Sequence, residues 1–586
     1  MIAKEGRAKL EQLFGLDLRS LALLRIGLAI LILTDLWKRA LDLQAHYSDT
    51  GILPRSVLIE QNLNPWRWSI HLFSGQALFQ GFLFIVAAAI ALALLIGYRT
   101  RFVTILSWAL LLSLQLRNPL INNAGDVELR LVLFWSIFLP LGAHYSVDRA
   151  LNSSSRTLPK SIITPATVAL TLQVCFVYWF TWALKSDPVW HTEGSAVYYA
   201  LNLDYLVTPI GKFLLNFPSL LVFLTFVTLW FELLGPFLLF IPFRTDLFRF
   251  LAVVLFIGLH IGFGSGLLIG LFPYVSAVAW LAFLPGGFWQ IISRRFGKSQ
   301  GEEIRVYYNQ KEDFSKKIAH LLRTFLILPK MQILPAQEEP EVLAEIKGRR
   351  SLVVSNEQGE LFSQADAVTY LFRASPLFRF LAKVLPWRVI KFIGKKLALL
   401  PTKSFLKFRP LKIHTSRKTN LLVSFFLVLV SWWNLRTVAP DMFKIPKDAD
   451  AFARVLGLDQ TWNMFTPRPP TKDGWYVIPG KLRDGTEIDL FQGGESVSWD
   501  KPKLISGTFR NMRWRKYIMA LHRKDKKKYR LYYGRYLCRS WNDRHKVSQH
   551  LDTFEINFML EKTLPNYQTP KVEKLRIWKH RCSKRS

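Results

Sequence analysis

Residues 18–36, LRSLALLRIGLAILILTDL, form a run that is long and apolar enough to cross a bilayer as one helix. Eight further apolar runs of similar character follow it, at 77–98, 102–116, 129–145, 165–184, 220–243, 248–263, 267–289 and 421–436. The sequence therefore predicts an α-helical multispan membrane domain with about nine transmembrane helices.

The composition indicates that a water-exposed part accompanies these helices. Of the 586 residues, 51% are hydrophobic and 20% are charged, which is too apolar for an ordinary soluble protein and too charged for membrane helices alone. The formal net charge is +35, and the Lys and Arg residues lie mainly in 293–418 and 514–586. Because these segments flank apolar helices, we expect membrane lipids as partners and no nucleic acid.

The basic residues of the short loops predict an orientation. Arg99, Arg149 and Arg244 fall in connections on the same side as the basic N-terminus, which places that side in the cytoplasm. We therefore expect about eight spans within 1–292, a cytosolic basic insert at 293–418, a last transmembrane helix at 419–437 and an extracytoplasmic domain at 438–586. The first 18 residues have no apolar core typical of a cleaved signal, so we expect an uncleaved, multi-pass protein of the cell inner membrane.

The two water-exposed parts have different patterns. In the insert, strand patterns at 303–308 and 351–355 alternate with helical patterns at 314–326 and 365–372, which predicts a small α/β unit. In the C-terminal part, 475–478 and 487–491 flank a turn and predict a hairpin in a β-rich domain. Cys538 and Cys582 can form a disulfide if this domain faces an oxidising compartment.

The charged or titratable residues that fall inside the apolar runs include four that need an explanation. They are Arg25, Asp35, Glu232 and His260. Such residues are costly in a bilayer unless they are paired or hydrated, so we expect them to line a cavity. The alternative is that Arg25 and Asp35 only form a pair or extend to the membrane surface.

Two polar segments lie on the predicted external side. The first is RNPLINNAGDVELR at 117–130, which contains Asn122, Asn123, Asp126 and Arg130. A short polar loop at membrane depth is tolerated only against protein or a water-filled cavity, although a solvated turn is the alternative. The second is KSDPVWHTE at 185–193, which contains Lys185, Asp187 and Trp190. A lysine against an apolar wall has a lowered pKa and can act as a base, whereas a lysine that reaches the headgroups is the simpler alternative.

Several motifs, in order along the chain, resemble the HTTM family, which includes vitamin K-dependent γ-glutamyl carboxylase. They are LRIGLAILILTDL at 24–36, HYSDTGILPR at 46–55, NNAGD at 122–126, HYSVD at 144–148, KSDPVWHTEG at 185–194, FELL at 231–234 and HIGFGSGLLIGLFPYV at 260–275. The resemblance implies a membrane enzyme in which a lysine deprotonates reduced vitamin K or another quinone. We expect no metal cofactor. It implies Lys185, Glu232 and His260 as catalytic residues. Asn122, Asn123, Asp126, Arg130, Asp187 and Trp190 would bind the substrate, which includes a protein or peptide in the carboxylase.

The chain departs from this pattern at Ala124, where the carboxylase has a histidine. The resemblance therefore leaves carboxylation open and suggests the bacterial branch of the family. The insert is similar to the DCC family of thiol-oxidoreductase-like domains, which have a thioredoxin-like fold, but its window at 310–315 contains no cysteine. Thiol exchange requires a thiolate, so we expect a degenerate domain. A non-catalytic membrane scaffold or lipid-binding protein is the alternative function. A transporter ranks last, because the sequence shows no repeated pairs of spans.

Overall fold

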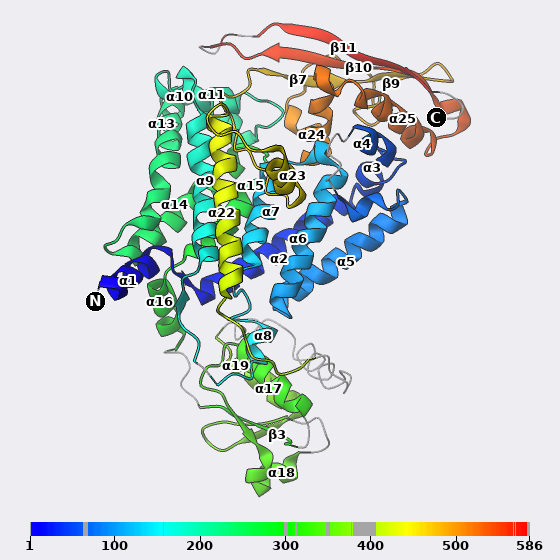
Figure 1. Cartoon of the computed structure of the whole chain (residues 1–586). Helices are drawn as coiled ribbons and strands as arrows, with labels where there is room; N and C mark the ends of the chain where they lie inside the picture. The colour runs from blue at the N-terminus through cyan, green and yellow to red at the C-terminus, as the bar shows by residue number, and fades with distance from the viewer. Residues whose placement is uncertain are drawn as a thin grey trace.

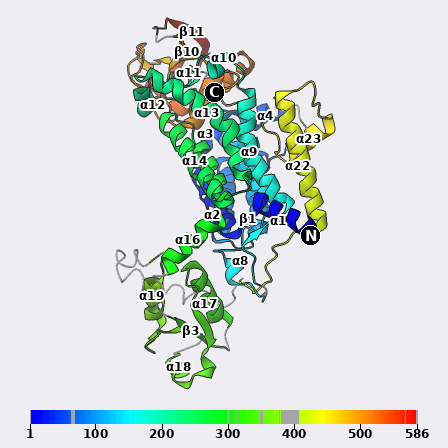
Figure 2. The ribbon, with the colours of Figure 1, turned by 90° about the vertical axis from the view of Figure 1, so that its left-hand side faces the viewer.

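The computed structural model describes residues 2–61, 68–155, 157–297, 303–310, 313–346, 352–376, 378, 406–565, 568 and 570–582. The long helices form one bundle, with the insert at one end and the β-rich C-terminal domain at the other (Figure 1). The view turned by 90° shows the same order of parts (Figure 2). The insert and the C-terminal domain are thus separated by the full length of the helices.

The bundle is built from long helices joined by short helical turns. Its α-helices are α1 (Ile2–Phe14), α2 (Leu18–Ala40), α3 (Leu43–Tyr47), α4 (Arg55–Gln61), α5 (Ala77–Ile96), α6 (Thr100–Arg117), α7 (Ala124–Ser136), α8 (Val147–Ala150), α9 (Pro165–Leu184), α10 (Pro188–His191), α11 (Ala196–Leu201), α12 (Pro209–Leu214), α13 (Pro218–Leu234), α14 (Thr245–Gly266), α15 (Phe272–Trp280), α16 (Gly286–Gly297) and α22 (Arg417–Val438). Two short strands, β1 (Leu16–Asp17) and β2 (Ser161–Ile162), pair beside the start of α2.

Six described helices are long and apolar enough to cross a membrane. They span Leu18–Ala40, Ala77–Ile96, Pro165–Leu184, Pro218–Phe240, Thr245–Gly266 and Arg417–Val438. A seventh candidate is the pair Phe272–Phe283 and Gly286–Arg295, which bends by 86°. The chain is therefore a membrane protein with several apolar helices, and the count of nine stays a prediction.

Two of the predicted runs are interrupted by proline. The run 129–145 is α-helical only to Ser136, the end of α7, and Pro140 follows outside any helix or strand. The run 267–289 is broken between α15 and α16, where Pro285 stands. Proline has no backbone N–H and clashes with the preceding turn, so a continuous helix is disfavoured at both places.

The insert contains a four-stranded sheet. Its elements are β3 (Arg305–Tyr308), α17 (Asp313–Phe325), β4 (Gln332–Pro335), α18 (Pro340–Glu345), β5 (Leu352–Ser355), β6 (Leu361–Ser363) and α19 (Gln364–Ala374). The order of strands is β4-β3-β5-β6, with β3 and β4 parallel and the other pairs antiparallel. The strands and helices expected from the sequence are present, and the cysteine-free window at 310–315 falls partly outside the described residues.

The C-terminal domain has a five-stranded antiparallel sheet and three helices. Its elements are α23 (Lys447–Val455), β7 (Lys472–Val477), β8 (Pro479–Leu482), β9 (Glu487–Asp489), α24 (Met512–Leu521), α25 (Tyr529–Asn542), β10 (Leu551–Lys562) and β11 (Val572–Arg581). The central strand β10 pairs with β11, β7 and β8. The predicted hairpin exists, but its first strand is β8 and not 475–478, which belongs mainly to β7. A disulfide joins Cys538 to Cys582.

The hydrophobic cores show how these parts are connected. One core joins the membrane helices to the C-terminal domain and includes Leu28, Trp135 and Trp280 together with Tyr476 and Tyr517. The insert has a core of its own around Val306 and Leu371. The C-terminal domain is therefore packed on the helices as part of one unit, whereas the insert is a separate folding unit.

Candidate functional site

A cavity of about 970 Å³ lies where α9, α13 and α14 meet the C-terminal domain. Helix α9 contributes Tyr178, Thr181 and Lys185, which are spaced so that they share one face. Helix α24 closes part of the opposite wall with residues of one face, namely Met512, Arg515, Lys516 and Met519. Most of the remaining lining is aliphatic or aromatic, as in pockets that bind small apolar ligands.

Lys185 and Glu232 form a buried ion pair in the wall of this cavity. Lys185 caps the C-terminus of α9, and its Nζ lies 2.5 Å from Glu232 Oε2 on α13. The same Nζ lies 4.0 Å from the ring centroid of Trp190, so the aromatic face contacts the ammonium. Burial lowers the pKa of Lys185, while the Glu232 carboxylate acts in the opposite direction.

His260 belongs to a chain of hydrogen bonds in the same wall. The indole Nε1–H of Trp280 donates to the Tyr178 hydroxyl at 2.8 Å, and that hydroxyl lies 2.7 Å from His260 Nε2. When the Tyr178 hydroxyl donates to Nε2, the Trp280 N–H, the Tyr178 hydroxyl and His260 Nε2 all have hydrogen-bond partners, and the imidazole proton is on Nδ1. His260 Nδ1 has no hydrogen-bond partner among the described residues, so a polar group remains available on this cavity-lining side chain.

Asn123 and Ala124 reach the cavity from the start of α7. Asn123 is the N-cap of α7 and forms a capping box with Asp126. Its side-chain amide lies 3.3 Å from Met512 Sδ of the C-terminal domain. Both residues line the cavity, and Ala124 contributes only a methyl group there.

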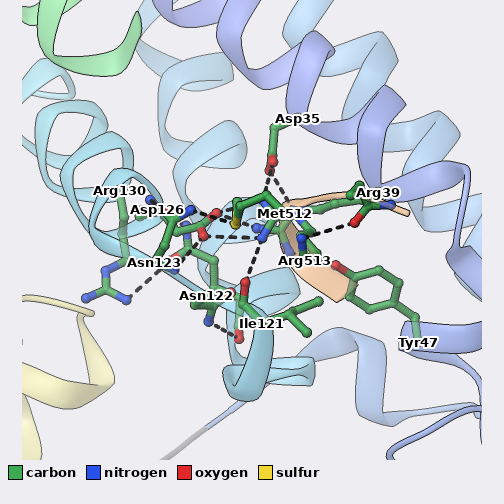
Figure 3. A network of polar contacts seen from close by, with 12 residues as sticks. Asp35, Arg39, Tyr47, Ile121, Asn122, Asn123, Asp126, Arg130, Met512 and Arg513 are labelled. Atoms are coloured by element: carbon green, nitrogen blue, oxygen red, sulfur yellow. Dashed lines mark hydrogen bonds and ion pairs between the residues drawn. The ribbon is translucent and has the colours of Figure 1, made fainter. Parts of the chain in front are cut away.

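Asp126 lies outside the cavity lining, in a buried network of ions (Figure 3). Arg39 contacts Asp35 at 2.7 Å and Asp126 at 2.6 Å. Arg513 of α24 contacts the same two carboxylates, at 2.5 Å and 3.0 Å. Two guanidinium groups thus alternate with two carboxylates, and Tyr47 accepts a hydrogen bond from Arg39. Asp35 is therefore paired, but with Arg39 and Arg513 and not with Arg25.

Three other predicted substrate-binding residues also lie outside the cavity lining. Asn122 donates to the Gln115 carbonyl, and Arg130 donates to the Asp459 carbonyl at 2.7 Å. Asp187 accepts from the Val189 N–H at the start of α10. The expectation that the 117–130 loop forms a polar wall of the cavity therefore applies to Asn123 alone. The other loop residues hold helices and the C-terminal domain in place.

The predicted residues that the structure does bring together are Lys185, Glu232, His260, Asn123 and Trp190. No family model, curated protein or solved structure matches the chain. Among the described residues, no group of three or more His, Cys, Asp or Glu side chains is arranged to hold a metal ion.

Tyr178 and the basic residues of α24 were not predicted as site residues from the sequence. The spacing of 178, 181 and 185 on one helix face was a usable signal for Tyr178. The spacing of 512, 515, 516 and 519 was a similar signal for one face of α24, but it gave no indication of what that face contacts. Arg515 donates to the carbonyls of Tyr205 and Leu268, so it also fixes α24 against the membrane helices.

Proposed function

We propose that the chain is an HTTM-family membrane protein whose cavity binds a reduced quinone or another lipid-like substrate, with Lys185 as the base. The observation that carries this proposal is the Lys185–Glu232 pair in the wall of a mainly apolar cavity of about 970 Å³. Ligand cavities are typically ~300–1,000 Å³, so this one is large enough for a fused-ring quinol.

The chemistry of the pair suits removal of a proton from a hydroxyl. Lys185 and Glu232 together hold one proton, either as ammonium and carboxylate or as amine and carboxylic acid. A hydroxyl that approaches them can lose its proton to the pair, which then carries ammonium and carboxylic acid. Burial lowers the pKa of Lys185, which increases the share of the neutral amine that can accept this proton.

The remaining polar groups suit a ligand with two oxygen atoms on an apolar ring system. His260 Nδ1 has no hydrogen-bond partner among the described residues, so this side chain of the lining can pair with one oxygen, and Lys185 can act on the other. When bound with oxygen, a reduced naphthoquinone supplies the strong base needed to carboxylate a glutamate. The residues present fit this group, but Ala124 removes one imidazole that the carboxylase has.

We further propose that the membrane domain crosses the bilayer nine times. Helices α6 and α7 are packed between α5 and α9, and the bent pair of α15 and α16 completes the eighth crossing before the insert. The insert is proposed to have a degenerate thioredoxin-like fold, because a β-α-β unit is followed by an antiparallel strand pair and a helix with the order β4-β3-β5-β6.

The orientation that we propose has the N-terminus and the insert in the cytoplasm and the C-terminal domain outside. The two ends of the bundle carry different parts, and α22 leads from the insert to the C-terminal domain (Figure 1). The Cys538–Cys582 disulfide is favoured in an oxidising compartment, which supports an external C-terminal domain. The cavity then opens on the external side.

The test uses purified full-length protein with reduced naphthoquinone, oxygen, a glutamate peptide and labelled bicarbonate. We expect epoxide formation by the wild type and its loss in Lys185→Ala. The matched control is Lys503→Ala, which removes an exposed lysine of the C-terminal domain outside the cavity and should retain activity. Label in the peptide would show carboxylation. Absence of epoxide with correctly folded wild type would contradict the quinone chemistry.

A second candidate is a non-catalytic lipid-binding protein, which Ala124 favours. This function predicts that a quinone or lipid copurifies with the protein and is not converted. Quantitative mass spectrometry of extracted ligands before and after incubation with oxygen separates the two functions. Conversion that depends on Lys185 would exclude the non-catalytic candidate.

A further inference from the structure

A second cavity, of about 620 Å³, lies at the end of the bundle nearest the insert. Its walls come from the turn between α5 and α6, the segment between α7 and α8, and residues 407–416, which lead into α22. The backbone of Arg409 forms hydrogen bonds with the backbone of Leu151 and Ser153. The segment 407–416 is therefore fixed against the end of the helix bundle.

The lining of this cavity is strongly basic. It contains the exposed side chains of Arg99, Arg101, Lys407, Arg409 and Lys412. No carboxylate of the described residues forms an ion pair with any of these five.

The one acidic residue in the described lining is Asp148, and its carboxylate forms hydrogen bonds with the start of α6. It accepts hydrogen bonds from the backbone N–H groups of Arg99 and Thr100 and from the Thr100 hydroxyl, at 2.9, 2.7 and 2.6 Å. These bonds fix the start of α6. The single charge of Asp148 offsets at most one of the five cations, so the described lining keeps an excess of positive charge.

The cavity lies at the level where apolar helices end. Candidate span Ala77–Ile96 ends beside it, and candidate span Arg417–Val438 begins beside it, with Ser416 and Thr419 in the lining. The N-termini of α6 and α22 both point their positive dipole ends to this region. Apolar lining residues such as Phe102, Phe138 and Leu139 adjoin the basic ones. A ligand here meets cations on one side and hydrocarbon on the other.

We propose that this cavity binds the phosphate-bearing head group of an anionic membrane lipid. A phosphate with attached acyl chains matches both the excess of positive charge and the position at the end of the spans, and basic pockets between transmembrane helices bind such head groups. Free phosphate has the same charge but no apolar part to occupy the adjoining surface. The site is separate from the Lys185 cavity and does not depend on the quinone chemistry.

The test compares lipid binding by full-length variants in nanodiscs of phosphatidylcholine with added phosphatidylglycerol, measured by native mass spectrometry. Arg101→Gln with Arg409→Gln removes two cations from the cavity. Arg417→Gln with Lys418→Gln removes two exposed cations at the same end of α22 that do not line it. At about 1 kcal/mol per cation, the first pair should weaken phosphatidylglycerol binding about tenfold or more, and the second pair much less.

Two outcomes would overturn the proposal. Equal weakening by the two pairs of substitutions would show that only the general charge of this end matters. Competition by inorganic phosphate as effective as that by phosphatidylglycerol would assign the site to a free anion. If the first variant unfolds, Lys407→Gln with Lys412→Gln provides a second test of the same cavity, with the same expected result.

Discussion

The ammonium of Lys185 lies 2.5 Å from the carboxylate of Glu232, and both side chains are almost completely buried. Removing one partner leaves the other charge buried without compensation, which typically costs about 3–5 kcal/mol. We therefore expect Lys185→Met and Glu232→Leu each to lower the unfolding temperature strongly. The double variant should be more stable than either single variant. Thermal unfolding in detergent measures this, and additive losses would contradict an ion pair.

The contact of Arg513 with Asp35 and Asp126 is expected to fix the C-terminal domain on the bundle. Arg513→Ala leaves two buried carboxylates with Arg39 alone, so we expect a loss of about 3–5 kcal/mol. The control is Arg576→Ala, because the Arg576 side chain is 64% exposed and pairs with Glu555, whose side chain is 30% exposed. Such an exposed pair contributes about 1 kcal/mol or less. Similar losses in the two variants, measured by denaturant unfolding, would argue against a special role for Arg513.

We expect Asp473 to make the free energy of unfolding depend on pH near neutrality. Burial raises the pKa of Asp473 to about 7, and the Asp204 carboxylate adds to the increase. A carboxyl with a raised pKa binds its proton more tightly in the folded state. Stability is therefore lost as the pH rises from the unfolded pKa of ~4 through ~7.

The experiment for Asp473 is a series of unfolding measurements across this pH range. Relative to Asp473→Asn, the wild type should lose stability as the pH rises, because only the wild type must ionise a buried group. Asp500→Asn removes an exposed carboxylate of the same domain and serves as the control. A difference between wild type and Asp473→Asn that stays constant with pH would contradict the raised pKa.

The disulfide between Cys538 and Cys582 joins α25 to the residue after β11. It closes a segment with a sequence separation of 44 residues, and removal of such a link costs about 2–4 kcal/mol. We expect Cys538→Ser with Cys582→Ser to lower the unfolding temperature of the C-terminal domain, and a reductant to do the same in the wild type. Thiol labelling of intact cells should find both cysteines blocked. Two freely labelled thiols would place this domain in a reducing compartment.

Local sequence patterns predicted the helices and strands better than they predicted the contacts between them. The helix α17 was predictable because Phe314, Ile318 and Leu322 recur at helical spacing and form the core of the insert. The apolar helices were predictable from the length and hydropathy of their runs. The prolines Pro140 and Pro285 could have predicted the breaks in the helices. The length and hydropathy of a run, considered alone, do not indicate such breaks.

The candidate site was only partly predictable, because its partners are distant in sequence. Glu232 and His260 were identifiable as polar residues within apolar runs, and both line the cavity. The assignment of Asp126 and Arg130 to the same wall did not anticipate that Arg513 and Asp459 pair with them. Which arginine meets which carboxylate depends on how the C-terminal domain docks, and no local pattern encodes that.

The contribution of α24 to the cavity wall also sets an order of events during biosynthesis. The ribosome completes α9, α13 and α14 long before it reaches residues 512–519, so the Lys185–Glu232 pair first enters the membrane without its cover. The wall is completed only when the C-terminal domain has docked on the helices. A truncated or stalled polypeptide that ends before α24 therefore has the Lys185–Glu232 pair but lacks this part of the cavity wall.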